Sequence, residues 1–221
     1  MNLIKQFVTI MTLCISVCLT AQPQERTVYY EEKGEELIDK ASQKIQSYES
    51  LVIHFSYITE NTSHDQQDAA SGVIYLKGDK YNIAIDDHEY ISDGNTVWVY
   101  MKDVREIHIN DAENIEQSMN PVHMLNDFRE HYRAKLIRQE TVLGKIVNLV
   151  DVIPTKPHAF FKYRVAILDS DHMLSYIKAY DRHSGTYKIQ LDKIEKNADF
   201  PDEKFQFDES QYTDMDIIDL R

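Results

Sequence analysis

The sequence contains little cysteine, glycine and proline, with 2, 6 and 5 copies in 221 residues. Both cysteines, Cys14 and Cys18, lie in an apolar N-terminal stretch. Once that stretch is removed no thiol remains, which excludes disulfides, thiol chemistry and zinc–thiolate sites. The 14 tyrosines and the shortage of glycine favour a sheet with tight turns over a glycine-rich cofactor loop.

Positive charge is also scarce. The chain has 24 Lys and Arg against 37 Asp and Glu, a formal net charge of −13. Nucleic-acid binding depends on basic side chains that neutralise phosphates, so we expect no nucleic-acid partner. The same balance argues against docking on an anionic membrane surface. Length and composition suit one soluble globular domain.

Catalytic motifs are missing as well. The sequence has no GxSxG, GxGxxG, P-loop or HExxH pattern. Its nine histidines are scattered, and His123 and His131 are roughly 12 Å apart along a helix, too far to share a metal ion. A pair of glycosidase carboxylates would leave no sequence signature. We therefore predict a binding protein and not an enzyme, without metal or cofactor.

The N-terminus resembles an export signal. Lys5 precedes the apolar run Phe7–Leu19, and Ala21 is a small residue suited to cleavage. The run is shorter than the about 20 residues of a membrane span, although an uncleaved anchor is the alternative. We expect residues 1–21 to be a signal peptide, the compartment to be a bacterial periplasm, and residues 22–221 to form a single domain.

Hydrophobic periodicity predicts two amphipathic helices and many strands. Glu35–Ser50, after a loose arm at 22–33, and Pro121–Tyr132 have apolar residues at helical spacing. From Leu51 the period becomes two, with a loop tip at Glu60–Asp68. Ten or eleven strands are expected, at 51–57, 73–77, 81–86, 89–92, 96–101, 104–110, 134–140, 145–153, 160–168, 172–180 and 186–194, with Phe205–Phe207 as a further edge.

So many strands with two helices exclude a doubly wound parallel sheet. They predict a mainly β protein, with a strongly curved antiparallel sheet or barrel and the helices on its concave side. Three segments, 73–76, 96–101 and 146–153, are apolar on both faces. Either they are ordinary core with tolerated apolar residues outside, or a concave surface is incompletely filled by the helices and leaves room for a lipid.

Several segments in order resemble one family. They are the helix end Ile45–Leu51, the strand Gly72–Gly78, Ser92–Tyr100 with its DGxxxWxY pattern, Asn120-Pro121, and the turn from Asp181 to Gly185. Over residues 35–210 they resemble the LolA-like periplasmic lipoprotein carriers, in a form typical of Bacteroidetes-like sequences.

The resemblance implies an unclosed antiparallel β-barrel of about eleven strands, with helices as a lid over an apolar cavity. It also implies a carrier, expected to be a monomer, that receives acylated lipoproteins from an inner-membrane ABC exporter and passes them to an outer-membrane acceptor. Exposing an acyl chain to water costs about 0.8 kcal/mol per methylene, roughly 10 kcal/mol per chain. The family's lid-binding arginine has no clear counterpart, and Arg105, Arg129 and Arg133 are candidates.

Apolar and aromatic residues of the central strands and both helices are the predicted cavity lining, although periodicity does not determine which strand face points inwards. They are Leu37, Ile45, Phe55, Tyr57, Ile83, Trp98, Tyr100, Ile107, Ile109, Leu125 and Phe128. Two other functions remain open on the same fold. One is a carrier or sensor for another lipid or glycolipid, and the other is a regulatory sensor that binds a signalling protein.

Overall fold

The computed structural model describes residues 23–61, 66–112, 131–208, 210, 212 and 214–221. A long helix, α2 (Pro23–Gln46), precedes the strands. The strands are β1 (Leu51–Asn61), β2 (Gln66–Lys77), β3 (Lys80–Ile85), β4 (His88–Ser92), β5 (Thr96–Met101), β6 (Glu106–Asp111), β7 (Tyr132–Val142), β8 (Lys145–Pro154), β9 (Phe160–Leu168), β10 (Leu174–Asp181), β11 (Gly185–Lys196) and β12 (Asp216–Asp219). A short 3₁₀ helix, η2 (Asp202–Phe205), lies between β11 and β12.

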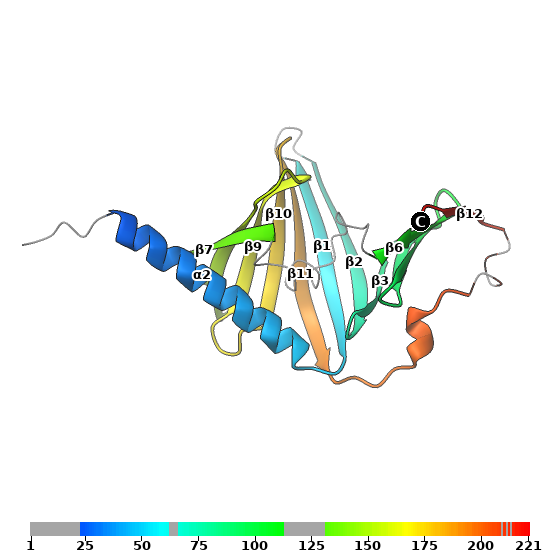
Figure 1. Cartoon of the computed structure of the whole chain (residues 1–221), viewed down its shortest axis with the longest axis horizontal. Coiled ribbons are helices and arrows are strands. Elements are labelled where there is room, and N and C mark those ends of the chain that lie inside the picture. The colour runs from blue at the N-terminus through cyan, green and yellow to red at the C-terminus, as the bar shows by residue number, and fades with distance from the viewer. Residues whose placement is uncertain (1–22, 62–65, 113–130, 209, 211, 213) are drawn as a thin grey trace, which may run out of the picture.

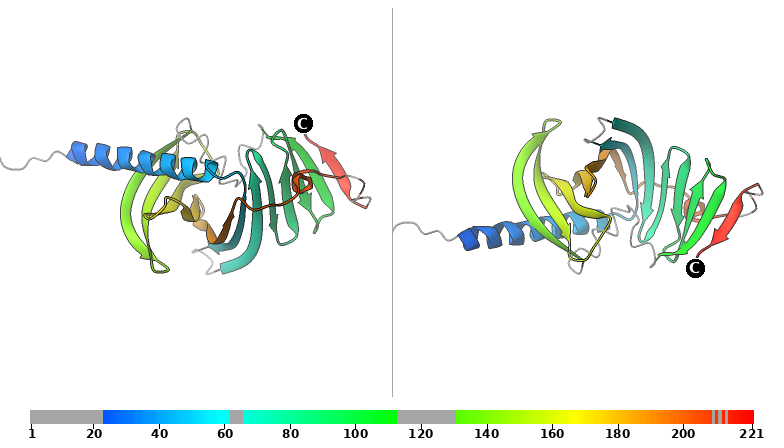
Figure 2. Two further views of the ribbon diagram at one scale, coloured as in Figure 1. Left: turned by 90° about the horizontal axis from the view of Figure 1, so that it is seen from below. Right: turned by 90° about the horizontal axis from the view of Figure 1, so that it is seen from above.

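All twelve strands form one sheet in the order β12-β6-β5-β4-β3-β2-β1-β11-β10-β9-β8-β7. Every pairing is antiparallel except that of β12 with β6. Strands β12 and β7 are the two ends of the order, so the sheet does not close. It is strongly curved, with α2 crossing it (Figures 1 and 2). The predicted fold class, a mainly β protein with an unclosed antiparallel sheet under helical cover, is confirmed, and in the described residues one long helix, α2, packs against the sheet.

The predicted start of the first helix is wrong. Residues 23–33 are helical, not a loose arm, and α2 begins at Pro23, a residue suited to a first helical turn. Gly34 lies inside the helix because α2 crosses β7 closely there. A β-carbon on Gly34 would lie 2.7 Å from the Leu136 amide nitrogen and 2.8 Å from the Lys135 carbonyl carbon. The N-terminal turns of α2 project beyond β7 (Figure 1).

Three further predictions change. The expected loop at Glu60–Asp68 is shorter, because β1 continues to Asn61 and β2 starts at Gln66. Phe205–Phe207 is not a strand, since η2 ends at Phe205, and the added edge is β12. The second helix falls almost wholly on 113–130 and the signal peptide on 1–22, outside the described residues. Within the part that is described, no helix combines the length and apolar character that a membrane crossing needs.

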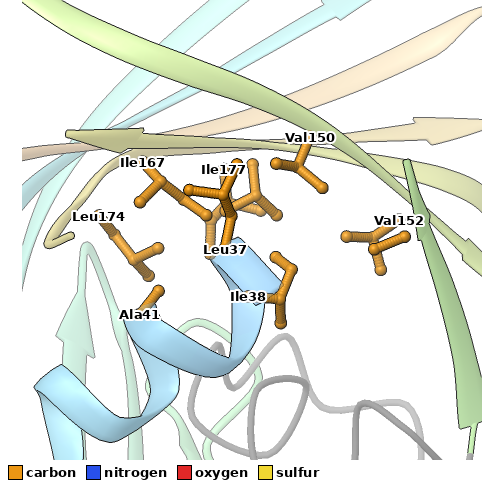
Figure 3. Close-up of a cluster of buried hydrophobic side chains, with 10 residues drawn as sticks. Leu37, Ile38, Ala41, Val150, Val152, Ile167, Leu174 and Ile177 are labelled. Atoms are coloured by element: carbon orange, nitrogen blue, oxygen red, sulfur yellow. The ribbon is translucent and has the colours of Figure 1, made fainter. Parts of the chain in front are cut away.

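The sheet has an inner face, which carries α2, and an outer face. On the inner face, Leu37, Ile38 and Ala41 of α2 pack against β7–β10, including Val150 and Ile177 (Figure 3). A second inner cluster covers β1–β5 and consists of Leu51, Ile53, Phe55, Ile74, Leu76, Tyr81 and Val97. A smaller cluster on the outer face contains Val147, Leu149, Ala166 and Tyr176. Both faces therefore bury apolar side chains.

The segment after β11, which we name the C-terminal strap (residues 199–221), crosses the outer face of β3–β6 in its described part (Figure 2). Phe205 is 1% exposed, and the ring of Phe200 lies 5.4 Å from that of Tyr75. The buried Asn82 side-chain amide donates to the Lys204 carbonyl. The strap then ends in β12, beside β6.

Candidate functional site

The cross-strand register determines which apolar residues share a face. In the antiparallel half from β1 to β5, Ile53 lies opposite Ile74, Ile74 opposite Ile83, Ile83 opposite Tyr90, and Tyr90 opposite Val99. Directly opposed residues point to the same side of a sheet. This row therefore lies on one face, the inner one, which also carries the cluster reached by Ile45 of α2.

The neighbouring row lies on the outer face. Tyr75 is opposite Asn82, Asn82 opposite Ile91, Ile91 opposite Trp98, and Trp98 opposite Ile109. Successive residues of a strand point to opposite sides. Trp98 and Val99 consequently belong to different surfaces of the molecule.

The eleven residues predicted to line one cavity do not share a single surface. Five lie on the inner face or on α2 against it, namely Leu37, Ile45, Phe55, Tyr57 and Ile83. Four lie on the outer face, namely Trp98, Tyr100, Ile107 and Ile109. Leu125 and Phe128 fall outside the described residues. The expectation that all the strand residues of this set face inwards is thus corrected for β5 and β6.

Trp98 was predicted to line the cavity, but it points outwards and packs against the C-terminal strap. The ring of Trp98 stacks on that of Phe207 at 5.9 Å, and Phe207 stacks on Tyr212 at 5.0 Å. Tyr100 packs at 5.2 Å against Tyr212. The outer apolar residues of β5 are thus covered by the chain's own aromatic side chains, which are too far away in sequence for periodicity to reveal.

Both halves of the inner face contain fully buried side chains, including Leu51, Ile53 and Ile74 on β1 and β2, and the half on β1–β5 also presents half-buried ones. Under α2, Ile38 is 1% exposed, and Val150, Val152, Val165 and Ile167 are fully buried. This half is solid core, and Leu37 belongs to it. Beside it, on β1–β5, several inward side chains are only half-buried. We name this the inner apolar face, and it consists of Tyr57, Ile83, Ile85, Tyr90 and Val99.

The inner apolar face is shaped by small and aromatic residues. The ring of Phe55 approaches Gly72 so closely that a β-carbon on Gly72 would overlap it. Ile45, near the C-terminal end of α2, and Tyr48, two residues beyond that end, pack against the same cluster. The site therefore lies beside the end of the helix, on the half of the sheet that presents half-buried side chains on its inner face.

Electrostatics agree with a poorly hydrated surface. Burial raises the pKa of Tyr57 to about 12, with smaller contributions from Tyr187 and Tyr90. Burial likewise raises the pKa of Tyr90. The neutral phenols are favoured because the phenolate would lose its water. Chemically, such a surface offers apolar contact and a few hydroxyl groups.

A metal centre is not supported by the described residues. In that part of the chain, no three side chains of His, Cys, Asp or Glu come together as metal ligands would. The shape-tolerant Ile, Val and Tyr side chains of the inner apolar face are suited to contact with flexible hydrocarbon.

Ile85, Tyr90 and Val99 were missed by the sequence prediction. The signal was available in the turns, because Ile85 pairs with His88 across a two-residue turn and so places Tyr90 opposite Ile83. Ser92 pairs with Val97 across the next turn, which puts Val99 and not Trp98 beside Tyr90. Counting pairs outwards from both turns would have shown that these residues share one face with Ile83.

Comparison with known sequences gives one family. The profile described as "Outer membrane lipoprotein carrier protein LolA" matches residues 46–208, which includes β1–β11 and η2. Among curated proteins, none matches the sequence.

Solved structures resemble the chain at low sequence identity. A conserved protein from Thermus thermophilus has a TM-score of 0.55 at 7% identity, covering 84% of this chain and 98% of that one. A LolA superfamily protein from Nitrosomonas europaea has a TM-score of 0.45 at 12% identity, with coverage of 79% and 97%. The lipoprotein LppX from Mycobacterium tuberculosis has a TM-score of 0.46 at 14% identity, with coverage of 76% and 96%. At these identities the first likeness indicates the fold.

Proposed function

The chain belongs to the outer membrane lipoprotein carrier protein family, LolA, and on this premise we propose that it carries lipoproteins by holding their acyl chains against the inner apolar face. The observation that supports this proposal most directly is a row on the inner face that runs from Ile74 to Ile83, Tyr90 and Val99. Ile74 is buried, but the other three side chains are only half-buried. An ordinary core would bury Ile83, Tyr90 and Val99 as completely as it buries Val150 or Ile167.

The physical task matches this surface. An acyl chain that leaves a membrane loses roughly 10 kcal/mol of favourable burial, so its carrier must replace that contact. Non-directional contacts with isoleucine, valine and aromatic side chains do so without fixing the cargo's orientation. Release then requires no strong polar bond to be broken, which suits a protein that must hand its cargo on.

Helix α2 acts in this proposal as a fixed wall and not as a movable lid. Its apolar stripe is already buried against β7–β10, and the lack of a side chain at Gly34 lets its backbone lie close to β7. The acyl chain would enter beside Ile45, at the helix end, where the solid core gives way to the inner apolar face.

The wider role follows from the family and stays part of the proposal. We place the protein in a periplasm after removal of residues 1–21, as one domain of residues 22–221 and without catalytic activity. An inner-membrane ABC exporter would supply acylated lipoproteins, and an outer-membrane acceptor would receive them. A carrier of another lipid is the alternative on the same surface.

A binding titration with a fluorescent diacylated lipopeptide tests the site. Ile83→Glu should weaken binding at least about 10-fold, because an unpaired carboxylate in an apolar contact must be desolvated. Ile146→Glu is the matched control, since Ile146 is 54% exposed, and it should bind like the wild type. Equal affinities for a folded Ile83→Glu variant and the control would refute this location.

The nature of the cargo is tested by purifying the protein from the exporting cell's periplasm and analysing bound molecules by mass spectrometry. Recovery of acylated proteins, lost in the Ile83→Glu variant, is the expected result. Recovery of free lipid alone would favour the alternative carrier.

A further inference from the structure

A row of basic side chains crosses the outer face of β7–β11. Helix α2 packs on the inner face of the same half of the sheet. Lys135 of β7 lies opposite Asp151, Asp151 opposite Arg164, Arg164 opposite Lys178, and Lys178 opposite Lys188 of β11. Five adjacent strands thus contribute four cations and one carboxylate to a single line. With neighbouring strands ~4.8 Å apart, the row is roughly 19 Å long.

Like charges directly opposite one another destabilise a sheet, so the succession of Arg164, Lys178 and Lys188 needs an explanation. Ion pairs relieve part of the repulsion. Asp151 accepts two hydrogen bonds from Arg164, at 2.6 and 2.9 Å, and Glu60 accepts one from Lys178 at 2.9 Å.

Two more cations lie beside the row. Arg133 is opposite Ile153, and Lys162 Nζ lies 3.7 Å from a carboxylate oxygen of Asp151, the same group that binds Arg164. Asp151 therefore compensates two cations at once, and positive charge exceeds negative charge along this line. We name the six cations, Arg133, Lys135, Lys162, Arg164, Lys178 and Lys188, the basic patch.

Aromatic rings hold ammonium groups of the basic patch at the surface. Lys162 Nζ lies 4.3 Å from the centre of the Tyr180 ring, and Lys188 Nζ lies 4.7 Å from that of Tyr176. Such cation–π contacts orient a lysine without neutralising it. The positive charge therefore stays available to a binding partner.

Two exposed apolar side chains lie at one margin of the basic patch. Ile153 is 47% exposed and lies opposite Arg133, and Phe161, 43% exposed, is the neighbour of Lys162 and packs near Tyr180. Apolar and aromatic groups set among lysine and arginine are the chemistry of a protein that rests on a membrane interface.

We propose that the basic patch, with Phe161 and Ile153, docks the protein on the surface of an anionic phospholipid bilayer. The row is too long for one small anion, and it lies on an outer sheet face where a broad surface can reach it. The net charge of −13 does not prevent this, since screening at physiological salt confines each charge to about 8 Å. Docking uses the face opposite the inner apolar face and does not depend on the cargo.

Vesicle flotation of the full chain tests the proposal, with vesicles of phosphatidylcholine alone or mixed with phosphatidylglycerol as probes. The protein should bind only the anionic vesicles, and less as salt rises. The triple variant Arg133→Gln, Lys135→Gln, Lys188→Gln should bind at least about 10-fold more weakly, and it leaves the ion pairs of Asp151 and Glu60 intact. Phe161→Ala should lower binding to the same vesicles without changing its salt dependence.

The matched control carries Lys44→Gln, Lys80→Gln and Lys102→Gln, which changes net charge equally at positions outside β7–β11. It should bind like the wild type, and equal loss in both triples would overturn the proposal. Binding that survives in Ile83→Glu separates docking from acyl-chain uptake. Absence of anionic-vesicle binding, or its replacement by binding to polyglutamate, would also overturn it, the latter in favour of an acidic protein partner.

Discussion

At the scale of single residues, Tyr57 reports on how dry the inner apolar face is. Its pKa is raised from 10.0 to about 12 because burial disfavours the phenolate. The folded state therefore favours the protonated form, and the associated stability is complete below about pH 10 and lost as pH rises from about 10 to about 12.

We expect an absorbance titration of the phenolates to lose a late-ionising component in Tyr57→Phe. Denaturant unfolding should show that wild-type stability falls more steeply between about pH 10 and about pH 12 than that of the variant. Tyr29→Phe is the control, because Tyr29 is exposed. Identical pH profiles for wild type and Tyr57→Phe would contradict the assignment.

Gly34 is the second informative residue. Alanine is favoured over glycine in an isolated helix by about 0.8–1.0 kcal/mol, but here its β-carbon would meet the backbone of β7. Backbone cannot move aside as a flexible side chain can, so Gly34→Ala should destabilise the protein by about 1–3 kcal/mol. Urea unfolding measures the change, and Gln43→Ala in the same helix should differ from wild type by less than about 0.5 kcal/mol.

At the scale of elements, the C-terminal strap has the clearest consequences. Phe205 is fully enclosed between the strap and the sheet, beside Phe200 at 5.8 Å. Its replacement by alanine should cost about 3–5 kcal/mol, as for other buried phenylalanines. Thermal and urea unfolding test this, with the exposed neighbour Gln206→Ala as control. A loss below about 1 kcal/mol, the range of ordinary surface changes, would mean that the strap is not part of the folded core.

Trp98 is the chain's single tryptophan and stacks on Phe207 of the strap, so tryptophan fluorescence reports on the outer face of β5 where the strap covers it. Phe207→Ala should move its emission to longer wavelength, because the ring gains contact with water. Acyl-chain binding should leave the emission maximum unchanged, since Trp98 lies on the face opposite the inner apolar face. A shift of the Trp98 emission maximum when lipid is added, both in the wild type and in the Ile83→Glu variant, would place the lipid on the outer face instead.

At the scale of the whole molecule, one sheet separates two surfaces of opposite character. The inner apolar face lies on β1–β5 and the basic patch on the outer face of β7–β11. Substitutions on separate surfaces with no shared partners act independently. Combining Ile83→Glu with the basic-patch triple should therefore leave each binding defect unchanged in its own assay. Strong coupling would show that membrane docking and lipid uptake use one surface.

Much of this architecture was predictable from local chemistry. The period of two from Leu51 and the turns at Asp86-Asp87 and Asp93–Asn95 determine the strands, because side-chain alternation and turn residues act over a few positions. The amphipathic stripe of Leu37, Ile38 and Ala41 determined a helix with one buried side. The lack of nucleophile and phosphate motifs favoured a binding protein on composition and spacing alone.

Tertiary structure decided the rest, because it depends on contacts between distant segments. The face of β5 that points inwards is determined by the register of several neighbouring strands. Trp98 is covered by Phe207 of the strap, a residue that is remote from it in the sequence. The basic patch unites positions 133 to 188 that show no charge run in the sequence. Alternation revealed that each strand has two faces, but only the assembled sheet, with a helix on one side and a strap on the other, determined what each face contacts.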